Sequence, residues 1–241
     1  MTLARRIAAE ATGTAMLLAA VVGSGIMGER LAGGNVAIAL LANTLATGAV
    51  LVALILTFGT ISGAHFNPAV TVAAAWERGL PWSEVPAYVG AQLLGALGGV
   101  GVADMMFSLP PFSLSQHARQ GSAQLLSEFV ATFGLLSVIW GCSRLRSSAL
   151  VAFAVAAYIT AAYWFTASTS FANPAVTIAR SLTDTFAGVR PVDVPGFMVV
   201  QFFGALAATA LFRWLVPALP AAAPRVVARG LESVARRGTT G

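Results

Sequence analysis

The sequence predicts an all-α membrane protein with six transmembrane helices and two shorter re-entrant half-helices, arranged as an inverted internal repeat. The composition is 57% hydrophobic and only 10% charged, whereas a soluble domain carries about 25% charged residues. The mean hydropathy is +0.80. A pentapeptide, Asn-Pro-Ala-Val-Thr, occurs at residues 67–71 and again unchanged at 173–177. These observations place nearly the whole chain in a bilayer and divide it into two similar halves.

Six apolar segments approach the roughly 20 residues that cross a hydrocarbon layer. Arg5 and Arg6 precede the first segment, but its apolar run continues past Val22 without an obvious cleavage site. We therefore interpret it as a retained span rather than a signal peptide. The six predicted spans are Ile7–Met27, Val36–Phe58, Val85–Met106, Ala123–Cys142, Ser148–Phe165 and Val194–Leu215.

Each pentapeptide is expected to begin a half-helix. The Asn can act as the N-cap and the Pro as the first helical residue, where a missing N–H costs nothing. The predicted half-helices, Pro68–Trp76 and Pro174–Leu182, have about nine residues, so each is about 14 Å long, half the thickness of a bilayer core. Irregular backbone at this depth persists only where it is buried in protein or lines a wet cavity. Two capped helix starts therefore predict an aqueous path.

The repeat extends beyond the pentapeptide. The approximate repeat units are residues 5–108 and 122–216, and each contains three spans and one half-helix. Because three is odd, the second unit must cross the membrane upside down, and such inverted repeats commonly place a permeation site at the midplane. The matching pairs outside the pentapeptide are Glu10 with Glu128, Thr14 with Thr132, Gln92 with Gln201 and Ala96 with Ala205.

The charged residues predict the orientation. All fourteen basic residues are arginines, and the net charge is +5. An orientation with both termini in the cytoplasm divides the arginines ten to four in favour of the inside, as the positive-inside rule requires. The basic tail, residues 217–241, is interpreted as a contact with anionic lipid rather than with nucleic acid. The single Cys142 excludes an internal disulfide and a multi-cysteine metal site.

The paired Asn-Pro-Ala boxes, with Ser62-Gly-Ala-His65 before the first, resemble the aquaporin and aquaglyceroporin family. The flanking Glu and Gln repeats and the number of spans agree with this resemblance. It implies a single channel domain over residues 1–241, one pore per subunit, a homotetramer and passive flow. It also implies a bilayer and small neutral solutes as partners, a bacterial inner (plasma) membrane location, and no cofactor, metal or nucleic acid.

Physical reasoning on the boxes agrees with this expectation. Each half-helix N-terminus carries about +0.5 of an elementary charge, so two facing termini oppose a cation or hydronium at the centre. The side-chain N–H groups of Asn67 and Asn173 can donate to a passing oxygen while their oxygens cap the helices. The expected pore motifs are Asn67, Pro68, Ala69, Asn173, Pro174 and Ala175.

The resemblance also assigns the surroundings of the boxes. Glu10 and Glu128 are intramembrane carboxylates, and their symmetric placement predicts that they anchor the two loops by accepting backbone N–H groups. Leu17 and Leu135 are expected to form the apolar wall beside the Asn pair. His65 is interpreted as a hydrogen-bonded loop anchor rather than a proton shuttle. The expected pore-lining carbonyls are those of Gly63, Ala64, His65, Thr169, Ser170 and Phe171.

The outer selectivity filter departs from the family pattern. This filter is expected to consist of four residues. Val176 stands where most members have Arg, and distances from the boxes place the other three residues at Thr47, Ala161 and Ser170. This set has no aromatic ring, no His and no charge, which predicts a wider and less cationic filter, although Phe171 can narrow it again.

Arg180, four residues beyond Val176, is interpreted as a solvated surface ion pair with Asp184. The alternative is a displaced positive charge at the outer mouth.

We therefore expect a passive channel for small uncharged solutes such as water and glycerol. The small-residue filter resembles that of bacterial aquaporins associated with arsenic resistance. We therefore include arsenite and methylated arsenicals among the expected solutes. The alternatives are a water-only aquaporin and an ion-coupled secondary transporter, for which Glu10 and Glu128 would be the only titratable candidates. An enzyme is not expected, because the hydroxyl groups of Thr166, Ser168, Thr169 and Ser170 have no positioned base.

Overall fold

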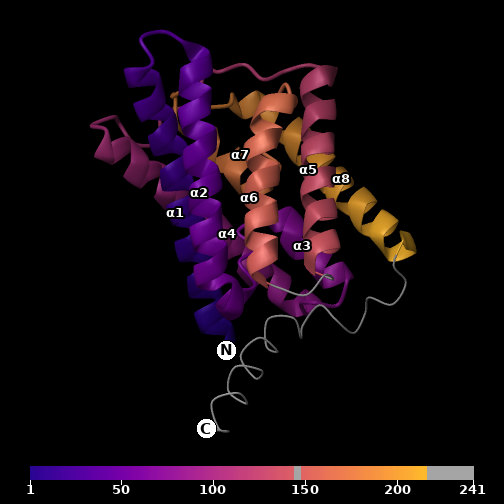
Figure 1. Cartoon of the computed structure of the whole chain (residues 1–241). Helices are drawn as coiled ribbons and strands as arrows, with labels where there is room; N and C mark the ends of the chain where they lie inside the picture. The colour runs from indigo at the N-terminus through magenta and orange to yellow at the C-terminus, as the bar shows by residue number, and fades with distance from the viewer. Residues whose placement is uncertain (144–147, 216–241) are drawn as a thin grey trace, which may run out of the picture.

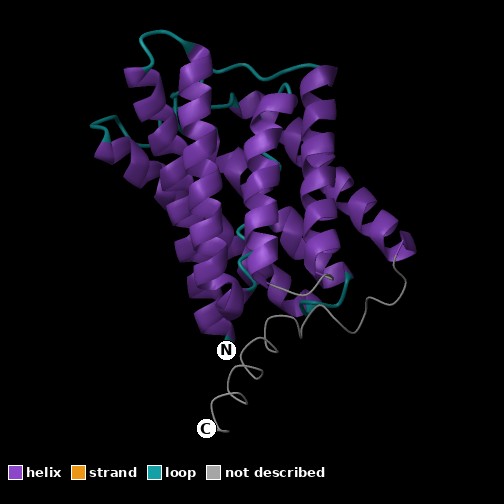
Figure 2. Ribbon diagram, viewed as in Figure 1, coloured by secondary structure: helices purple, strands orange, loops and turns teal. Residues whose placement is uncertain are grey.

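The computed structural model describes residues 1–143 and 148–215, and within these ranges every regular element is a helix (Figure 2). The predicted basic tail, together with Arg144 and Arg146, lies outside the described residues. The first half contains α1 (Leu3–Leu31), α2 (Val36–Ser62), α3 (Pro68–Trp76), the 3₁₀ turn η1 (Trp82–Glu84) and α4 (Val85–Met106). The second half repeats this order with α5 (Ser122–Ser143), α6 (Ser148–Phe165), α7 (Pro174–Arg180), η2 (Pro191–Asp193) and α8 (Val194–Leu215).

The all-α class and its division into long and re-entrant helices are confirmed. The bounds of α4, α6 and α8 match the predicted spans, while α1 and α2 extend about one turn further. Thr2 caps the start of α1, and α2 continues to Gly63, which ends it in the left-handed region at φ +95°. The second half-helix is shorter than predicted, because it ends at Arg180 instead of Leu182.

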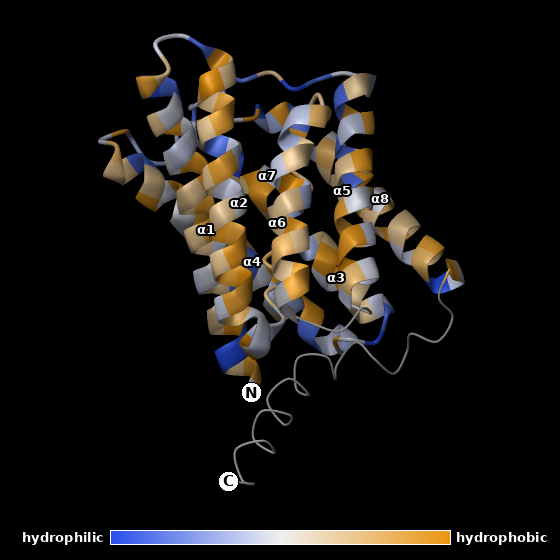
Figure 3. Cartoon of the chain, in the orientation of Figure 1, coloured by the Kyte–Doolittle hydropathy of each residue, from blue (hydrophilic) through white to orange (hydrophobic). Residues whose placement is uncertain are grey.

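Five helical stretches of the described chain are long and apolar enough to cross a membrane, and α6 adds the shorter apolar stretch Leu150–Phe165. Hydrophobic residues recur along the whole length of the helices, whereas the most hydrophilic residues lie mainly near the helix ends and in the loops (Figure 3). This distribution suits a bundle whose sides face lipid and whose two ends face water.

The two halves pack in matching ways. Helix α1 contacts α2 and α4, and α5 contacts α6 and α8 in the same manner. Helices α2 and α6 join the halves, and the half-helices α3 and α7 meet inside the bundle. In Figure 1, α3 lies in the lower part of the bundle and α7 in the upper part, so the two half-helices approach from opposite ends. This is the inverted arrangement expected from the repeat.

Close contacts between helices depend on glycine. A Cβ atom at Gly95 or Gly99 of α4 would overlap the carbonyl oxygens of Ala11 and Ala15 in α1. In the other half, a Cβ at Gly204 of α8 would lie 2.6 Å from the Phe129 carbonyl oxygen in α5. Small residues at such positions let helix backbones approach closely in a membrane. The glycines therefore set the distance between the helices that hold the two half-helices.

Adjacent glycines on α4 test this role. We expect Gly99→Ala to lower the free energy of unfolding by about 1–3 kcal/mol, because the added methyl group overpacks the α1 contact. Gly98→Ala is the matched control, since a Cβ there meets no atom within 4 Å. The midpoint of thermal unfolding in detergent should fall for Gly99→Ala and stay level or rise for Gly98→Ala. Equal midpoints would contradict this packing role.

Candidate functional site

The two Asn side chains hold the half-helices together at the centre of the bundle. Asn67 Oδ1 accepts the Ala69 N–H at 2.9 Å, and Asn173 Oδ1 accepts the Ala175 N–H at 3.0 Å, so both residues cap their helices. Each amide nitrogen donates across to the opposite half. The acceptor of the Asn67 amide is the Ala172 carbonyl at 2.8 Å, and that of the Asn173 amide is the Phe66 carbonyl at 2.7 Å. Because an amide has two N–H bonds, one remains on each Asn for a solute.

Glu10 fixes the loop before the first half-helix. Its carboxylate accepts the backbone N–H groups of His65 at 3.0 Å and Phe66 at 2.7 Å, and the Ser62 hydroxyl at 2.6 Å. It also accepts Gln92 Nε2 at 2.8 Å. The carboxylate is completely buried, and these charge-assisted hydrogen bonds account for its burial.

Glu128 does the same for the second loop. It accepts the N–H groups of Phe171 and Ala172, each at 2.8 Å, and Gln201 Nε2 at 2.6 Å. Gln201 also donates to Thr177 of α7 at 2.9 Å, as Gln92 donates to Thr71 of α3 at the same distance. The repeat seen in the sequence is therefore a repeated hydrogen-bond network.

Both loops have unusual backbone conformations. Positive φ angles occur at Ala64 and Phe66 in the first loop, at 49° and 48°. They recur at Ser170 and Ala172 in the second, at 51° and 49°. A non-glycine residue in this region costs about 1–3 kcal/mol and persists only where its surroundings enforce it. Here the buried glutamates enforce it.

A cavity of about 420 Å³ runs along both boxes. Its lining extends from Arg6 near the start of α1 to Arg180 at the end of α7. The expected residues that line it are Leu17, Leu135, Gly63, Ala64, His65, Ser170, Phe171, Asn67 and Asn173. Thr169 is not among the lining residues, and its hydroxyl instead accepts a hydrogen bond from Arg119 at 3.3 Å.

The end of the cavity near α7 differs from the predicted filter. Thr47, Ser170 and Val176 line it, but Ala161 is exposed on the outside of α6 and is absent from the lining. Tyr163 takes the place predicted for Ala161, and its hydroxyl lies 3.3 Å from the Thr47 hydroxyl. The prediction of Ala161 was wrong because it counted residues across the irregular loop, which changes the phase of the helix.

The interpretation of Arg180 as a solvated ion pair with Asp184 was also wrong. Arg180 is only 2% exposed and lines the cavity. Its Nε donates to the Ala187 carbonyl, and its guanidinium carbon lies 3.5 Å from the centre of the Phe171 ring. Asp184 instead accepts the backbone N–H of Gln116 at 2.8 Å. Besides the Phe171 ring, which the sequence analysis considered, the filter region therefore contains the Tyr163 ring and the Arg180 cation, which the predicted set of small neutral residues lacked.

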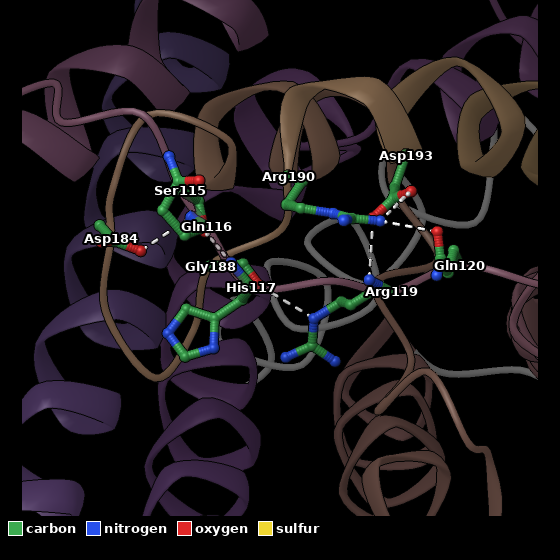
Figure 4. Close-up of polar contacts among 9 residues, drawn as sticks. All are labelled: Ser115, Gln116, His117, Arg119, Gln120, Asp184, Gly188, Arg190 and Asp193. Atoms are coloured by element: carbon green, nitrogen blue, oxygen red, sulfur yellow. Dashed lines mark hydrogen bonds and ion pairs between the residues drawn. The ribbon is translucent and has the colours of Figure 1, made fainter.

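The loop of residues 107–121 adds a second arginine (Figure 4). Its backbone is fixed to the segment before α8, where Asp193 accepts the Arg119 N–H at 2.8 Å. The Arg119 side chain points towards the helices below the loop and donates to the carbonyls of Gly188 at 2.9 Å and Ser168 at 3.0 Å. Burial lowers the pKa of this guanidinium from its ordinary value. Its carbon atom is 5.0 Å from the centre of the Phe171 ring.

Comparisons with known proteins identify the family. The family model described as "Major intrinsic protein" matches residues 1–150. Aquaglyceroporin AqpS of Rhizobium meliloti (strain 1021) is 54% identical over 219 residues, covering 90% of this chain and 93% of that protein. The chain belongs to the major intrinsic protein family. Nodulin-26 of Glycine max is 37% identical over 139 residues, covering 57% of this chain and 50% of that protein.

The fold of this major intrinsic protein also matches a solved structure. The aquaglyceroporin from Plasmodium falciparum superimposes with a TM-score of 0.70, covering 90% of this chain and 99% of that one at 20% identity. Together with the family, the cavity and the apolar helices, this makes the chain an integral membrane protein that acts as a passive channel for small solutes, and not an enzyme.

Tyr163 of this major intrinsic protein carried a signal that the sequence analysis did not use. Val155, Ile159 and Tyr163 are spaced four apart and all line the cavity, so the helical period of α6 points to Tyr163. For Arg180, the spacing of four residues from Val176 already offered the alternative of a displaced positive charge, and the place of Arg180 in the cavity lining agrees with that alternative. Arg119 carried no usable signal, because a 15-residue loop does not fix where its side chains lie.

Proposed function

We propose that this channel passes glycerol and similarly small neutral polyhydroxy solutes, including metalloid acids such as arsenite and methylated arsenicals, together with water. The observation that carries the proposal is the cavity itself, in which two Asn amides and a row of loop residues face an apolar wall. Such a lining suits a solute with hydroxyl groups on one side and carbon or a neutral metalloid on the other. The name of the Rhizobium meliloti relative supports the glycerol part.

The selectivity roles proposed for the boxes follow from their geometry. Asn67 and Asn173 each keep one N–H for solute oxygens, and both half-helix N-termini oppose cations. Thr47, Tyr163, Ser170, Val176 and Arg180 form the outer filter. Tyr163 and Phe171 make it narrower than a neutral set of small residues, which favours slender solutes such as glycerol.

An ion-coupled transporter is disfavoured by the state of the buried carboxylates. Glu10 and Glu128 already accept hydrogen bonds from backbone and side-chain N–H groups. Releasing either for ion coupling would leave these donors buried and unpaired, at about 1–3 kcal/mol each.

Uptake into proteoliposomes tests the proposal. We expect initial rates of glycerol and arsenite entry well above those of empty liposomes, unaffected by an uncoupler, with no accumulation beyond the external concentration. Fast water flow without glycerol or arsenite entry would favour a water-only channel. Accumulation that an uncoupler abolishes would favour the transporter.

The assembly and location are also proposals. We propose a homotetramer of single channel domains in a bacterial inner membrane, with both termini in the cytoplasm. The ten-to-four division of the fourteen arginines supports the orientation. Cross-linking in native membranes, followed by mass determination of the purified complex, should give four copies, and labelling of a tag at the N-terminus should require permeabilised cells.

A further inference from the structure

We propose that Arg180, supported by the positive charge of the neighbouring Arg119, forms a binding site for small monovalent oxyanions at the outer end of the channel. The inference rests on the proposed solute pathway, because Arg180 lines the same cavity. It concerns charged oxyacids, which the neutral-solute pathway does not by itself accept.

The site has two guanidinium groups without a carboxylate partner. Within the described part of the chain, no carboxylate oxygen lies within 4.0 Å of the guanidinium nitrogens of Arg180 or Arg119. Both guanidinium carbons lie near the Phe171 ring, at 3.5 Å for Arg180 and 5.0 Å for Arg119. A buried cation, Arg180, and a partly buried one, Arg119, held near one another raise the local positive potential, which favours an anion.

The neighbouring carboxylates are already committed. Asp184 accepts the N–H of Gln116, and Asp193 pairs with Arg190 at 3.1 Å. Glu128 accepts the N–H groups of its loop and the Gln201 amide. None of these groups is placed to neutralise Arg180 directly, so the positive charge is left for a ligand.

Unused donors face the cavity. The Arg180 Nε donates to the Ala187 carbonyl, and this is the one hydrogen bond that the side chain makes to the described residues, so its two terminal amino groups remain free to donate. The Ser170 hydroxyl, which also lines the cavity, is buried and has no partner among the described side chains and backbone groups. A planar guanidinium with two free amino groups can donate to two oxygens of one oxyanion.

The Phe171 ring explains why the guanidinium stays in place. Arg180 stacks on this ring, and the ring is held at 5.4 Å and 89° from Phe197 of α8. A guanidinium over an aromatic face gains a cation–π interaction without losing its in-plane N–H donors. The stack therefore positions the donors instead of consuming them.

Inhibition of glycerol uptake tests the site, with methanesulfonate as the probe because it is ionised at all working pH values. Proteoliposomes are equilibrated on both sides with potassium methanesulfonate, and the initial rate of [¹⁴C]glycerol entry is measured. Dimethyl sulfone is the neutral control of similar shape, and potassium chloride controls for ionic strength. We expect methanesulfonate to inhibit the wild type, and dimethyl sulfone and chloride to inhibit it much less.

Arg180→Gln should raise the inhibition constant for methanesulfonate by about tenfold or more, and Arg119→Gln should raise it by a smaller factor. Arg180→Lys, which keeps the charge, should retain part of the inhibition. The matched control is Arg30→Gln, because Arg30 is an exposed arginine outside the cavity lining, and this variant should behave as the wild type.

Equal inhibition of the wild type by all three probes would overturn the site, and so would full inhibition of Arg180→Gln by methanesulfonate. The wild-type comparison decides the question even where a variant does not fold. Absence of wild-type glycerol entry without any probe would instead contradict the proposed function, so the two failures are distinguishable.

Discussion

Replacing Glu128 with Gln should abolish solute flux and lower the free energy of unfolding by about 3–5 kcal/mol, as expected when one partner of a buried charged network is removed. The carboxylate accepts the N–H groups of Phe171 and Ala172 and the Gln201 amide. A Gln side chain would turn an N–H towards these donors and would remove the charge that strengthens the bonds. The positive φ at Ala172 would then lose its support. Glycerol uptake by proteoliposomes and thermal unfolding in detergent measure the two effects.

The control is Glu29→Gln, because Glu29 is exposed near the C-terminal end of α1 and this substitution removes the same charge away from the loops. It should leave flux and unfolding near the wild-type values. Glu10→Gln should behave like Glu128→Gln, since Glu10 holds the equivalent loop. Normal flux in Glu128→Gln would mean that the loop does not depend on this carboxylate.

The second large effect is expected from Val176→Arg. Val176 lines the cavity one helical turn from Arg180, so the new side chain would enter the path between Thr47 and Arg180. We expect glycerol uptake to fall by about tenfold or more, corresponding to ~1.4 kcal/mol or more in the barrier, while water flow persists. Stopped-flow light scattering measures both fluxes on the same vesicles.

Val192→Arg separates the position from the charge. Val192 is 76% exposed in η2 and is not among the cavity-lining residues, so this variant adds the same side chain outside the cavity. It should leave both fluxes unchanged. Unchanged glycerol uptake in Val176→Arg would show that this position does not lie at the constriction.

The sequence was a reliable guide wherever a structural feature is local. The half-helix starts at Pro68 and Pro174 follow from Asn capping and proline geometry, which need no tertiary information. The anchoring by Glu10 and Glu128 also followed from the sequence, because a buried carboxylate at equivalent positions of two repeats must find equivalent donors. These features account for the boxes, the loops and the class of protein.

The outer mouth was not predictable in the same way. Its residues come from α6, α7 and the 107–121 loop. Their positions depend on the backbone path of the irregular segments next to these helices, which the sequence pattern does not determine. Arg180 shows the difference: sequence spacing offered Asp184 as a partner, but the backbone after α7 directs that carboxylate to the Gln116 N–H. The predicted set of neutral filter residues was therefore incomplete, because Arg180, one helical turn beyond Val176, also lines the cavity.

The exchange of hydrogen bonds between the two Asn boxes has a consequence for biosynthesis. The acceptor of the Asn67 amide is the Ala172 carbonyl, and the donor to the Phe66 carbonyl is Asn173. During translation, the ribosome must add more than a hundred residues after Asn67 before either partner exists. The first re-entrant segment can be inserted early, but the hydrogen bonds between its loop and the second loop form only after the second segment is inserted. The centre of the pore is therefore completed in a late and cooperative step of assembly.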